Sequence, residues 1–202
     1  MIIVGLTGIM GSGKSTVTSL LKHRGLKVID LDALAKDSLN WKETQNDIKQ
    51  AFGEEYVIDN RVDVEALRRT VFNKDDNLRR LEAIIHPRVR EEVQKRLAAF
   101  EKSGVGTVII DHPLLFETGF HRKMDKIVVV TAKMDIIKER LKKRGMDADD
   151  IERRLSFQVP LEQKEKMADY VIDNNGTEDQ LKVQVDSLHE KITKWEVNTT
   201  CI

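Results

Sequence analysis

Eight consecutive residues near the N-terminus carry the clearest chemistry in the chain. The run Gly8-Ile9-Met10-Gly11-Ser12-Gly13-Lys14-Ser15 matches the pattern G-x-x-x-x-G-K-[ST] at each fixed position. Glycines let successive backbone N–H groups turn toward one anion, Lys14 can reach nucleotide phosphates, and the Ser15 hydroxyl can ligate Mg²⁺. The pattern predicts that a nucleoside triphosphate is bound by Gly8, Gly11, Ser12, Gly13, Lys14, Ser15 and Thr16.

Carboxylates at the ends of strand-like runs are the next candidates. Asp32 follows the run Val28-Ile29-Asp30, where it could accept the proton of an attacking hydroxyl or hold Mg²⁺ through water. The alternative role is a helix N-cap, and we assign chemistry to Asp32 and capping to Asp30. Asp111 ends an apolar run in the manner of a Walker B element, so it is a predicted Mg²⁺ ligand.

The segment after Asp111 is unusually apolar for a loop. Leu114 and Leu115 are large, so we predict that they help to form a wall of a substrate pocket. Glu117 could contact the substrate or the metal, or cap the following turn. His86 has no other His or Cys at ligand spacing, which favours a structural or substrate-contacting role over metal binding.

Buried strands must position these residues. Short runs rich in Val and Ile predict five of them, at residues 2–6, 27–30, 107–111, 126–131 and 170–172. Helical patterns lie between the strands, which indicates an α/β fold with a mostly parallel sheet. Phosphate chemistry then belongs at the carboxyl ends of the strands.

Two blocks interrupt this alternation. Residues 34–101 show no convincing strand and predict several helices, including 63–72 and 75–101, with a break or kink near His86 because Pro87 follows it. We expect this block to be a helical lobe over the substrate. Residues 135–166 are helical and highly charged, which predicts either a solvated helix face or a mobile lid whose arginines meet phosphates.

Composition limits the possible partners and compartment. The 202 residues carry 34 basic and 34 acidic side chains, so no net charge draws the chain to nucleic acid or to an anionic membrane. The single cysteine, Cys201, allows no internal disulfide, and no apolar run is long enough to span a bilayer. With no signal peptide ahead of the first strand, we expect a cytoplasmic protein without nucleic-acid or membrane partners.

Two other motifs point toward a GTPase. The run Asn73-Lys74-Asp75-Asp76 fits N-K-x-D, and Asp173-Asn174-Asn175-Gly176 fits D-x-x-G. GTPases place D-x-x-G first, whereas here the order is reversed and N-K-x-D follows a helical pattern. Asn73 is better explained as a helix end or cap, with Asp75 starting the next helix.

Beyond the phosphate-binding loop, several runs occur in the order of one known family. They include Val28-Ile29-Asp30-Leu31-Asp32, Leu81-Glu82-Ala83-Ile84-Ile85-His86-Pro87 and Pro113-Leu114-Leu115-Phe116-Glu117. Arg154-Leu155-Ser156-Phe157-Gln158 and Ala168-Asp169-Tyr170-Val171-Ile172-Asp173-Asn174 complete the set. The chain resembles the dephospho-CoA kinase family, within the nucleoside-monophosphate-kinase-like group, over about residues 2 to 188.

The resemblance implies a fold and a reaction. The fold is a three-layer P-loop NTPase of 1–202, with a nucleotide-binding core at 1–33, 102–134 and 167–202, a CoA-substrate lobe at 34–101 and a lid at 135–166. ATP, with Mg²⁺, would phosphorylate the ribose 3′-hydroxyl of dephospho-CoA, and the enzyme would be a monomer or weak homo-oligomer. Family positions assign proton acceptance to Asp32, lid cations to Arg140, Arg144 and Arg154, and the approach to adenine to Asn174, Asn175 and Gly176.

The chain also departs from the family pattern. Val64 stands where the family often has an arginine, and Arg61 or Arg68 could replace its contact with substrate phosphate. Leu31 replaces the usual alanine. Two alternative functions stay open at this point: another small-molecule kinase, of the nucleoside or shikimate type, and a nucleotide-dependent switch that binds a protein partner.

Overall fold

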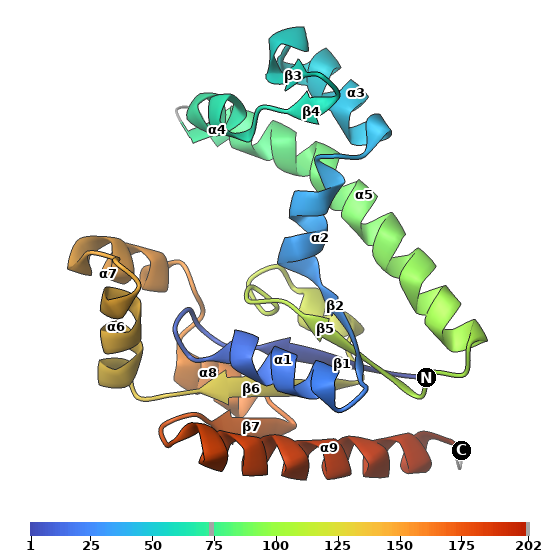
Figure 1. The fold of residues 1–202 in the computed structure, drawn as a ribbon, viewed down its shortest axis with the longest axis vertical. Helices are drawn as coiled ribbons and strands as arrows, with labels where there is room; N and C mark the ends of the chain where they lie inside the picture. Colours follow the sequence, from blue (N-terminus) through green and yellow to red (C-terminus); the bar gives the residue numbers. More distant parts are fainter. Residues whose placement is uncertain (73–74, 201–202) are drawn as a thin grey trace. The chain divides into compact units, whose positions relative to one another are not determined.

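The computed structural model describes residues 1–72 and 75–200 of the chain (Figure 1). These residues divide into two compact units, Met1–Ile29 with Glu101–Ile202, and Asp30–Phe100. Asn73, Lys74 and Cys201, which entered the sequence interpretation, lie outside the described residues. Within the described part of the chain, no helix combines the length and apolar character needed to cross a bilayer.

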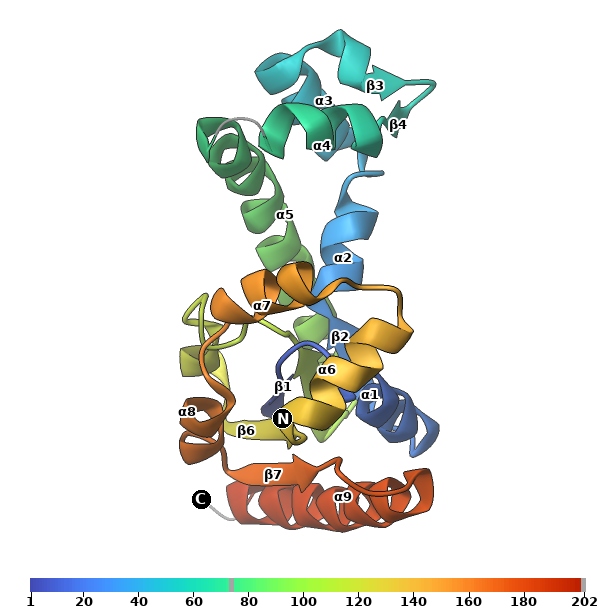
Figure 2. The same cartoon turned by 90° about the vertical axis from the view of Figure 1, so that its left-hand side faces the viewer.

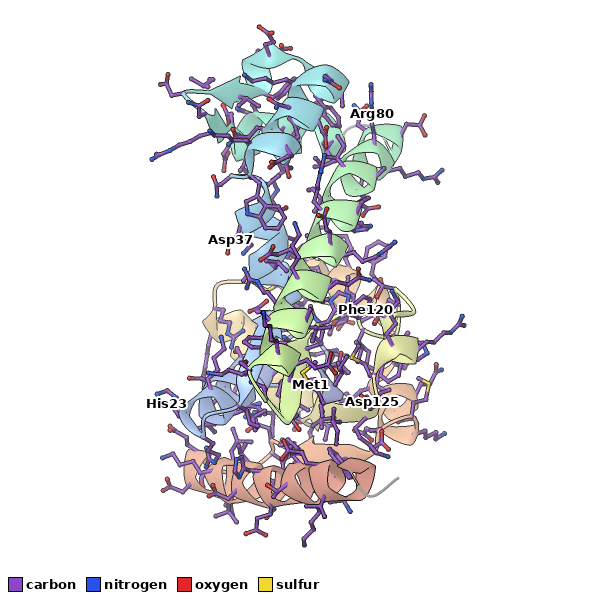
Figure 3. The ribbon with its side chains drawn as sticks, turned by 90° about the vertical axis from the view of Figure 1, so that its right-hand side faces the viewer. Met1, His23, Asp37, Arg80, Phe120 and Asp125 are labelled. Carbon is purple, nitrogen blue, oxygen red and sulfur yellow. The ribbon has the colours of Figure 1, made fainter. Side chains whose placement is uncertain are left out.

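The first unit is built on a parallel five-stranded sheet. Its strands are β1 (Ile2–Thr7), β2 (Lys27–Asp30), β5 (Thr107–Asp111), β6 (Lys126–Thr131) and β7 (Tyr170–Asp173), in the order β2-β5-β1-β6-β7. All five predicted strands are confirmed, with ends that differ by at most one residue. At the amino end of the sheet, Asp125 accepts a hydrogen bond from the Ile3 amide at 2.8 Å (Figure 3).

Two helices pack against this sheet and form a hydrophobic core with it. They are α1 (Lys14–His23) and α9 (Glu178–Thr200), which contact each other and β1 (Figure 1). The side chains of α9 that enter the core recur at alternating steps of four and three, as an amphipathic helix requires; they are Leu181, Val185, Leu188, Ile192 and Trp195. Each buried aliphatic side chain stabilises the fold by about 1.5 to 3 kcal/mol.

Three helices lie between β6 and β7 in the chain. They are α6 (Met134–Lys143), α7 (Ala148–Ser156) and α8 (Leu161–Lys166), and a short turn joins α6 to α7 (Figure 2). Ile137 and Leu141 of α6 are fully buried in a cluster with Ile9 of the phosphate-binding loop. The N-terminal part of the block expected to be a lid is therefore packed firmly onto the loop.

The second unit is mainly helical. It contains α2 (Leu31–Ser38), α3 (Lys42–Phe52), the 3₁₀ helix η1 (Glu54–Tyr56), α4 (Val64–Phe72) and most of α5 (Asp75–Lys102). Its core is formed by Ile48, Val57, Val62, Leu67 and Val71. Asp63 accepts a hydrogen bond from the Ala66 amide at 2.9 Å, which satisfies a free donor at the start of α4.

The expectation of no strand between residues 34 and 101 was wrong. β3 (Val57–Ile58) and β4 (Arg61–Val62) form an antiparallel hairpin of two residues each. Asp59 and Asn60 connect them with positive φ angles of 49° and 58°, which Asp and Asn tolerate better than most residues and which a tight hairpin turn needs. Strands of two residues are too short to give an alternating pattern.

Of the break or kink expected near His86, the break was wrong, because α5 runs through Pro87 as one helix. Proline lacks the N–H that would bond to the carbonyl four residues earlier, which belongs to Ala83. Ala83 and Pro87 are both exposed, so water can satisfy that carbonyl. The helix thus tolerates proline on its solvent side.

Candidate active site

The phosphate-binding loop connects β1 to α1. Gly11 and Gly13 have φ angles of 84° and 95°, a region that favours glycine, and Gly13 is the N-cap of α1. A Cβ atom on Gly13 would lie 2.0 Å from Nδ2 of Asn174, so a larger residue would displace that side chain. The loop therefore presents the N-terminus of α1, with its partial positive charge, as a site for an anion.

Lys14 forms an ion pair with Asp111, a contact that the sequence motifs did not predict. Oδ1 of Asp111 contacts the Lys14 ammonium, and Oδ2 accepts a hydrogen bond of 2.5 Å from the Thr18 hydroxyl. Asp111 is only 2% exposed, so its charge needs these partners. The register Leu6↔Asp111 between β1 and β5 places this carboxylate beside the start of the loop.

Arg140 and Asn174 hold the loop from the other side. The Ser12 carbonyl accepts hydrogen bonds from Asn174 Nδ2 at 2.8 Å and from Arg140 Nη1 at 3.4 Å. Nη2 of Arg140 donates to the Asn174 carbonyl at 2.9 Å. The family resemblance places Asn174 near the adenine, but the hydrogen bond from its side chain to the loop was not predicted. Its place directly after β7, at the edge of the sheet where the loop lies, is the signal that could have indicated this contact.

Asn175 lines a cavity of about 720 Å³ in the first unit. The Asn175 Oδ1 atom accepts a hydrogen bond from the Lys133 amide at 2.6 Å. The cavity is bordered by the end of β6, the connection between α7 and α8, and Ile9 of the loop. Asn175 thus joins the ends of β6 and β7 near the loop.

The predicted lid arginines have different surroundings. Arg140 is bonded to the loop, whereas Arg154 pairs with Asp150 on its own helix at 2.9 Å. Hydrogen bonds from Arg153 and Arg154 lower the pKa of Asp150. Arg144 is the exposed C-cap of α6.

Leu115 does not form the surface of a pocket, contrary to expectation. It is fully buried, and a Cβ atom on Gly5 would lie only 2.8 Å from its Cδ2 atom. Leu115 therefore anchors the segment after β5 to the sheet. Leu114 is 38% exposed and is the residue of the pair that can reach a ligand.

Glu117 pairs with Lys164, a residue that sequence reasoning missed. Their side chains meet at 2.8 Å, and the Glu117 Oε1 atom also accepts a hydrogen bond from the Val159 amide at 2.8 Å. Burial alone would raise the pKa of Glu117, but hydrogen bonds from Lys164 and from the Glu117 and Val159 amides lower it overall. Burial lowers the pKa of Lys164, and this effect is larger than that of Glu117, which raises it.

Asp30, Asp32 and His86 belong to the second unit. Oδ1 of Asp30 accepts a hydrogen bond from the Ala33 amide at 3.0 Å and caps α2, which confirms its structural assignment. Asp32 lies in the exposed first turn of α2, two residues beyond the end of β2, and His86 is exposed on α5.

The oxygen donors of Ser15 and Asp111 suit Mg²⁺ better than a metal ion that is held by protein side chains alone. In residues 1–72 and 75–200, no three His, Cys, Asp or Glu side chains are grouped to hold a metal ion. Mg²⁺ needs no such group, because it usually takes one or two protein oxygens together with water and substrate phosphates. Ser15 is an exposed residue at the start of α1, and the Asp111 carboxylate pairs with the adjacent Lys14.

The chain is similar to known proteins along most of its length. The model of the dephospho-CoA kinase family matches residues 2–180. A dephospho-CoA kinase of Corynebacterium efficiens is 40% identical over 195 residues, which cover 95% of this chain and 98% of the relative. A solved structure of a Thermus thermophilus protein is 34% identical, with a TM-score of 0.79 over 94% of this chain and 97% of the other.

A more distant structure shows only the fold. Shikimate kinase from Acinetobacter baumannii, in complex with shikimate, has a TM-score of 0.55 and 14% identity, and the match covers 96% of this chain and 94% of that one. The two chains therefore share a fold.

Proposed function

Because this chain belongs to the dephospho-CoA kinase family, we propose that its phosphate-binding loop and the residues around it carry out that family's phosphoryl transfer. The chain is an ATP-dependent kinase acting on dephospho-CoA. The ribose 3′-hydroxyl attacks the γ-phosphorus of ATP, the bond to the β-phosphate oxygen breaks, and ADP and CoA are formed. The ion pair of Lys14 with Asp111 at the N-terminus of α1 is the observation that carries the site assignment.

Nucleotide binding is assigned to the loop. We propose that its amides and the N-terminus of α1 hold the phosphates, and that Lys14 exchanges Asp111 for the β- and γ-phosphates when ATP binds. Such an exchange frees one Asp111 oxygen while Thr18 keeps hold of the other. Gly8, Gly11, Ser12, Gly13, Ser15 and Thr16 complete the assigned set, and Asn175 and Gly176 face the adenine.

Ser15 and Asp111 would hold magnesium. When bound, this ion neutralises charge on the β- and γ-phosphates. Ser15 supplies a hydroxyl oxygen, and Asp111 supplies a carboxylate oxygen directly or through water. Lys14 and Arg140 add positive charge where negative charge develops in the transition state.

Asp32 is proposed as the proton acceptor. It follows the carboxyl end of β2, and the carboxyl ends of parallel strands meet at one edge of a sheet. Its carboxylate would take the proton of the 3′-hydroxyl as that oxygen attacks. Residues 135–166 would act as a lid, from which Arg144 and Arg154 would reach the phosphates. Arg154 would break its ion pair with Asp150 to do so.

Substrate binding is assigned to 34–101, with His86 and Leu114 as candidate contacts. Val64 stands where the family often has an arginine, so another residue would have to make that contact. Arg68 lies one helical turn further along α4, and Val64 and Arg68 are both exposed. Arg68 is therefore favoured over Arg61 for the substrate phosphate. We further propose a cytoplasmic monomer or weak homo-oligomer, with no nucleic-acid or membrane partner.

The Ser15 assignment is tested by magnesium dependence. Ser15→Ala should raise the Mg²⁺ concentration needed for half-maximal turnover by about tenfold or more, because it removes a metal ligand. Ser19→Ala, at an exposed position one turn further along α1, is the matched control and should leave that concentration unchanged. An unchanged midpoint in Ser15→Ala would remove Ser15 from the metal site.

A further inference from the structure

Lys164 is the most deeply buried charged side chain in the described part of the chain. It lies on α8 with 0% exposure, and Figure 1 shows α8 beside β6. Its ammonium donates to Glu117 Oε1 at 2.8 Å and to the Pro113 carbonyl at 3.1 Å. A lysine is rarely buried without a specific partner, and here both acceptors belong to the segment that follows β5.

The hydrogen bonds of this pair continue to the phosphate-binding loop in both directions. On one side, the Pro113 carbonyl also accepts a bond of 3.2 Å from the hydroxyl of Thr7, the residue before Gly8. On the other side, Glu117 accepts the bond from the Val159 amide. The neighbouring Gln158 accepts a bond of 2.9 Å from the Met10 amide within the loop.

These contacts form a closed ring that begins and ends at the loop. Its members are Thr7, Pro113, Lys164, Glu117, Val159, Gln158 and Met10. The ring ties four segments together: the loop with the end of β1, the exit of β5, the connection between α7 and α8, and α8 itself. None of the side chains in it is needed to touch a phosphate.

We propose that Lys164 and Glu117 are a positioning pair for phosphoryl transfer, which fixes the C-terminal end of the 135–166 segment to the phosphate-binding loop. The pair acts through Val159 and Gln158, and Gln158 sets the place of Met10 in the loop. This proposal rests on the kinase function given above. Small displacements of catalytic groups cost large factors in rate, so loosening the ring should slow turnover.

The charges of the pair allow a structural role to be separated from a positioning role. Lys164→Met leaves Glu117 as a buried carboxylate without its cation, which should destabilise the fold strongly. The double variant Glu117→Met and Lys164→Met removes both charges and should recover most of the lost melting temperature. It still lacks the carboxylate that holds the Val159 amide, so the ring stays open.

The experiment measures melting temperature, kcat and KM for ATP, and amide exchange at Met10 and Val159. The double variant should melt near wild type, yet have kcat lowered about 10- to 100-fold with KM for ATP within a few-fold. Exchange at both amides should be about tenfold faster or more. Lys166→Met, which removes an exposed lysine of the same helix, is the matched control and should behave as wild type.

Recovery of wild-type kcat and amide protection in the double variant would overturn the proposal, because the pair would then serve stability alone. If Lys164→Met fails to fold, Gln158→Leu opens the ring without exposing a buried charge, and a wild-type kcat in that variant would equally overturn it. If the wild-type chain does not phosphorylate dephospho-CoA, the function fails, while amide exchange still tests the ring.

Discussion

Lys14 and Asp111 lie 97 positions apart in the chain and yet form one ion pair. The glycine pattern predicts Lys14, and the apolar run before Asp111 predicts a carboxylate at a strand end. Their meeting follows from the parallel pairing of β1 with β5. The contact of Asn174 with the loop and the pairing of Lys164 with Glu117 were not predicted, because each depends on a partner that is distant in sequence and no local pattern marks it.

Replacement of Lys14 should affect chemistry more than folding. Lys14→Ala is expected to lower kcat by at least about 100-fold, because it removes an electrostatic stabiliser of the transferring phosphate. Steady-state kinetics with saturating ATP measures this effect. Lys22→Ala, near the other end of the same helix, is a suitable control. Near-normal turnover of Lys14→Ala would refute the assignment of the loop.

Asp32 is expected to act on the rate and not on nucleotide affinity. Asp32→Asn keeps the shape of the side chain but cannot accept a proton in the same way, so kcat should fall by about 100-fold or more while the Kd for ATP changes little. Comparing kcat with calorimetric ATP binding separates the two effects. Loss of ATP binding with chemistry otherwise intact would make Asp32 a metal or folding residue.

At the scale of elements, the five long strands were predictable because buried parallel strands give continuous Val and Ile runs. The hairpin of β3 and β4 was not, since two residues per strand leave no periodic signal. Pro87 also misled the prediction. Its effect on a helix depends on whether the freed carbonyl faces water, and a local proline rule does not contain that information.

The stability that the Glu117–Lys164 ion pair gives to the fold should depend on pH. Glu117 has a lowered pKa in the folded state, so as the pH falls the unfolded chain takes up the proton first and stability declines. The stabilising contribution is complete above the ordinary carboxyl pKa of about 4.5 and is lost as the pH falls through the lower folded value. Glu117→Gln should therefore be less stable than wild type at pH 7.

That difference in the free energy of unfolding should shrink as the pH is lowered from 5 toward 3, because the wild-type carboxyl becomes neutral too. Denaturant titrations of both proteins across this range measure it. A difference that stays constant over the range would show that the charge of Glu117 does not stabilise the fold.

For the whole molecule, alternation of strands and helices predicted the α/β class, and the family resemblance predicted the reaction. Composition alone gave neither, since 34 basic and 34 acidic residues suit many proteins. The phosphate-binding loop belongs to the unit formed by Met1–Ile29 and Glu101–Ile202, whereas Asp32 belongs to the unit Asp30–Phe100.

The most direct test of the central claim is release of ADP from Mg·ATP by the purified chain, with and without dephospho-CoA, and with shikimate as an alternative acceptor. We predict that ADP forms rapidly only with dephospho-CoA, and that mass spectrometry finds a product heavier by one phosphate. ADP release by a folded, ATP-binding sample that dephospho-CoA does not stimulate would contradict the account.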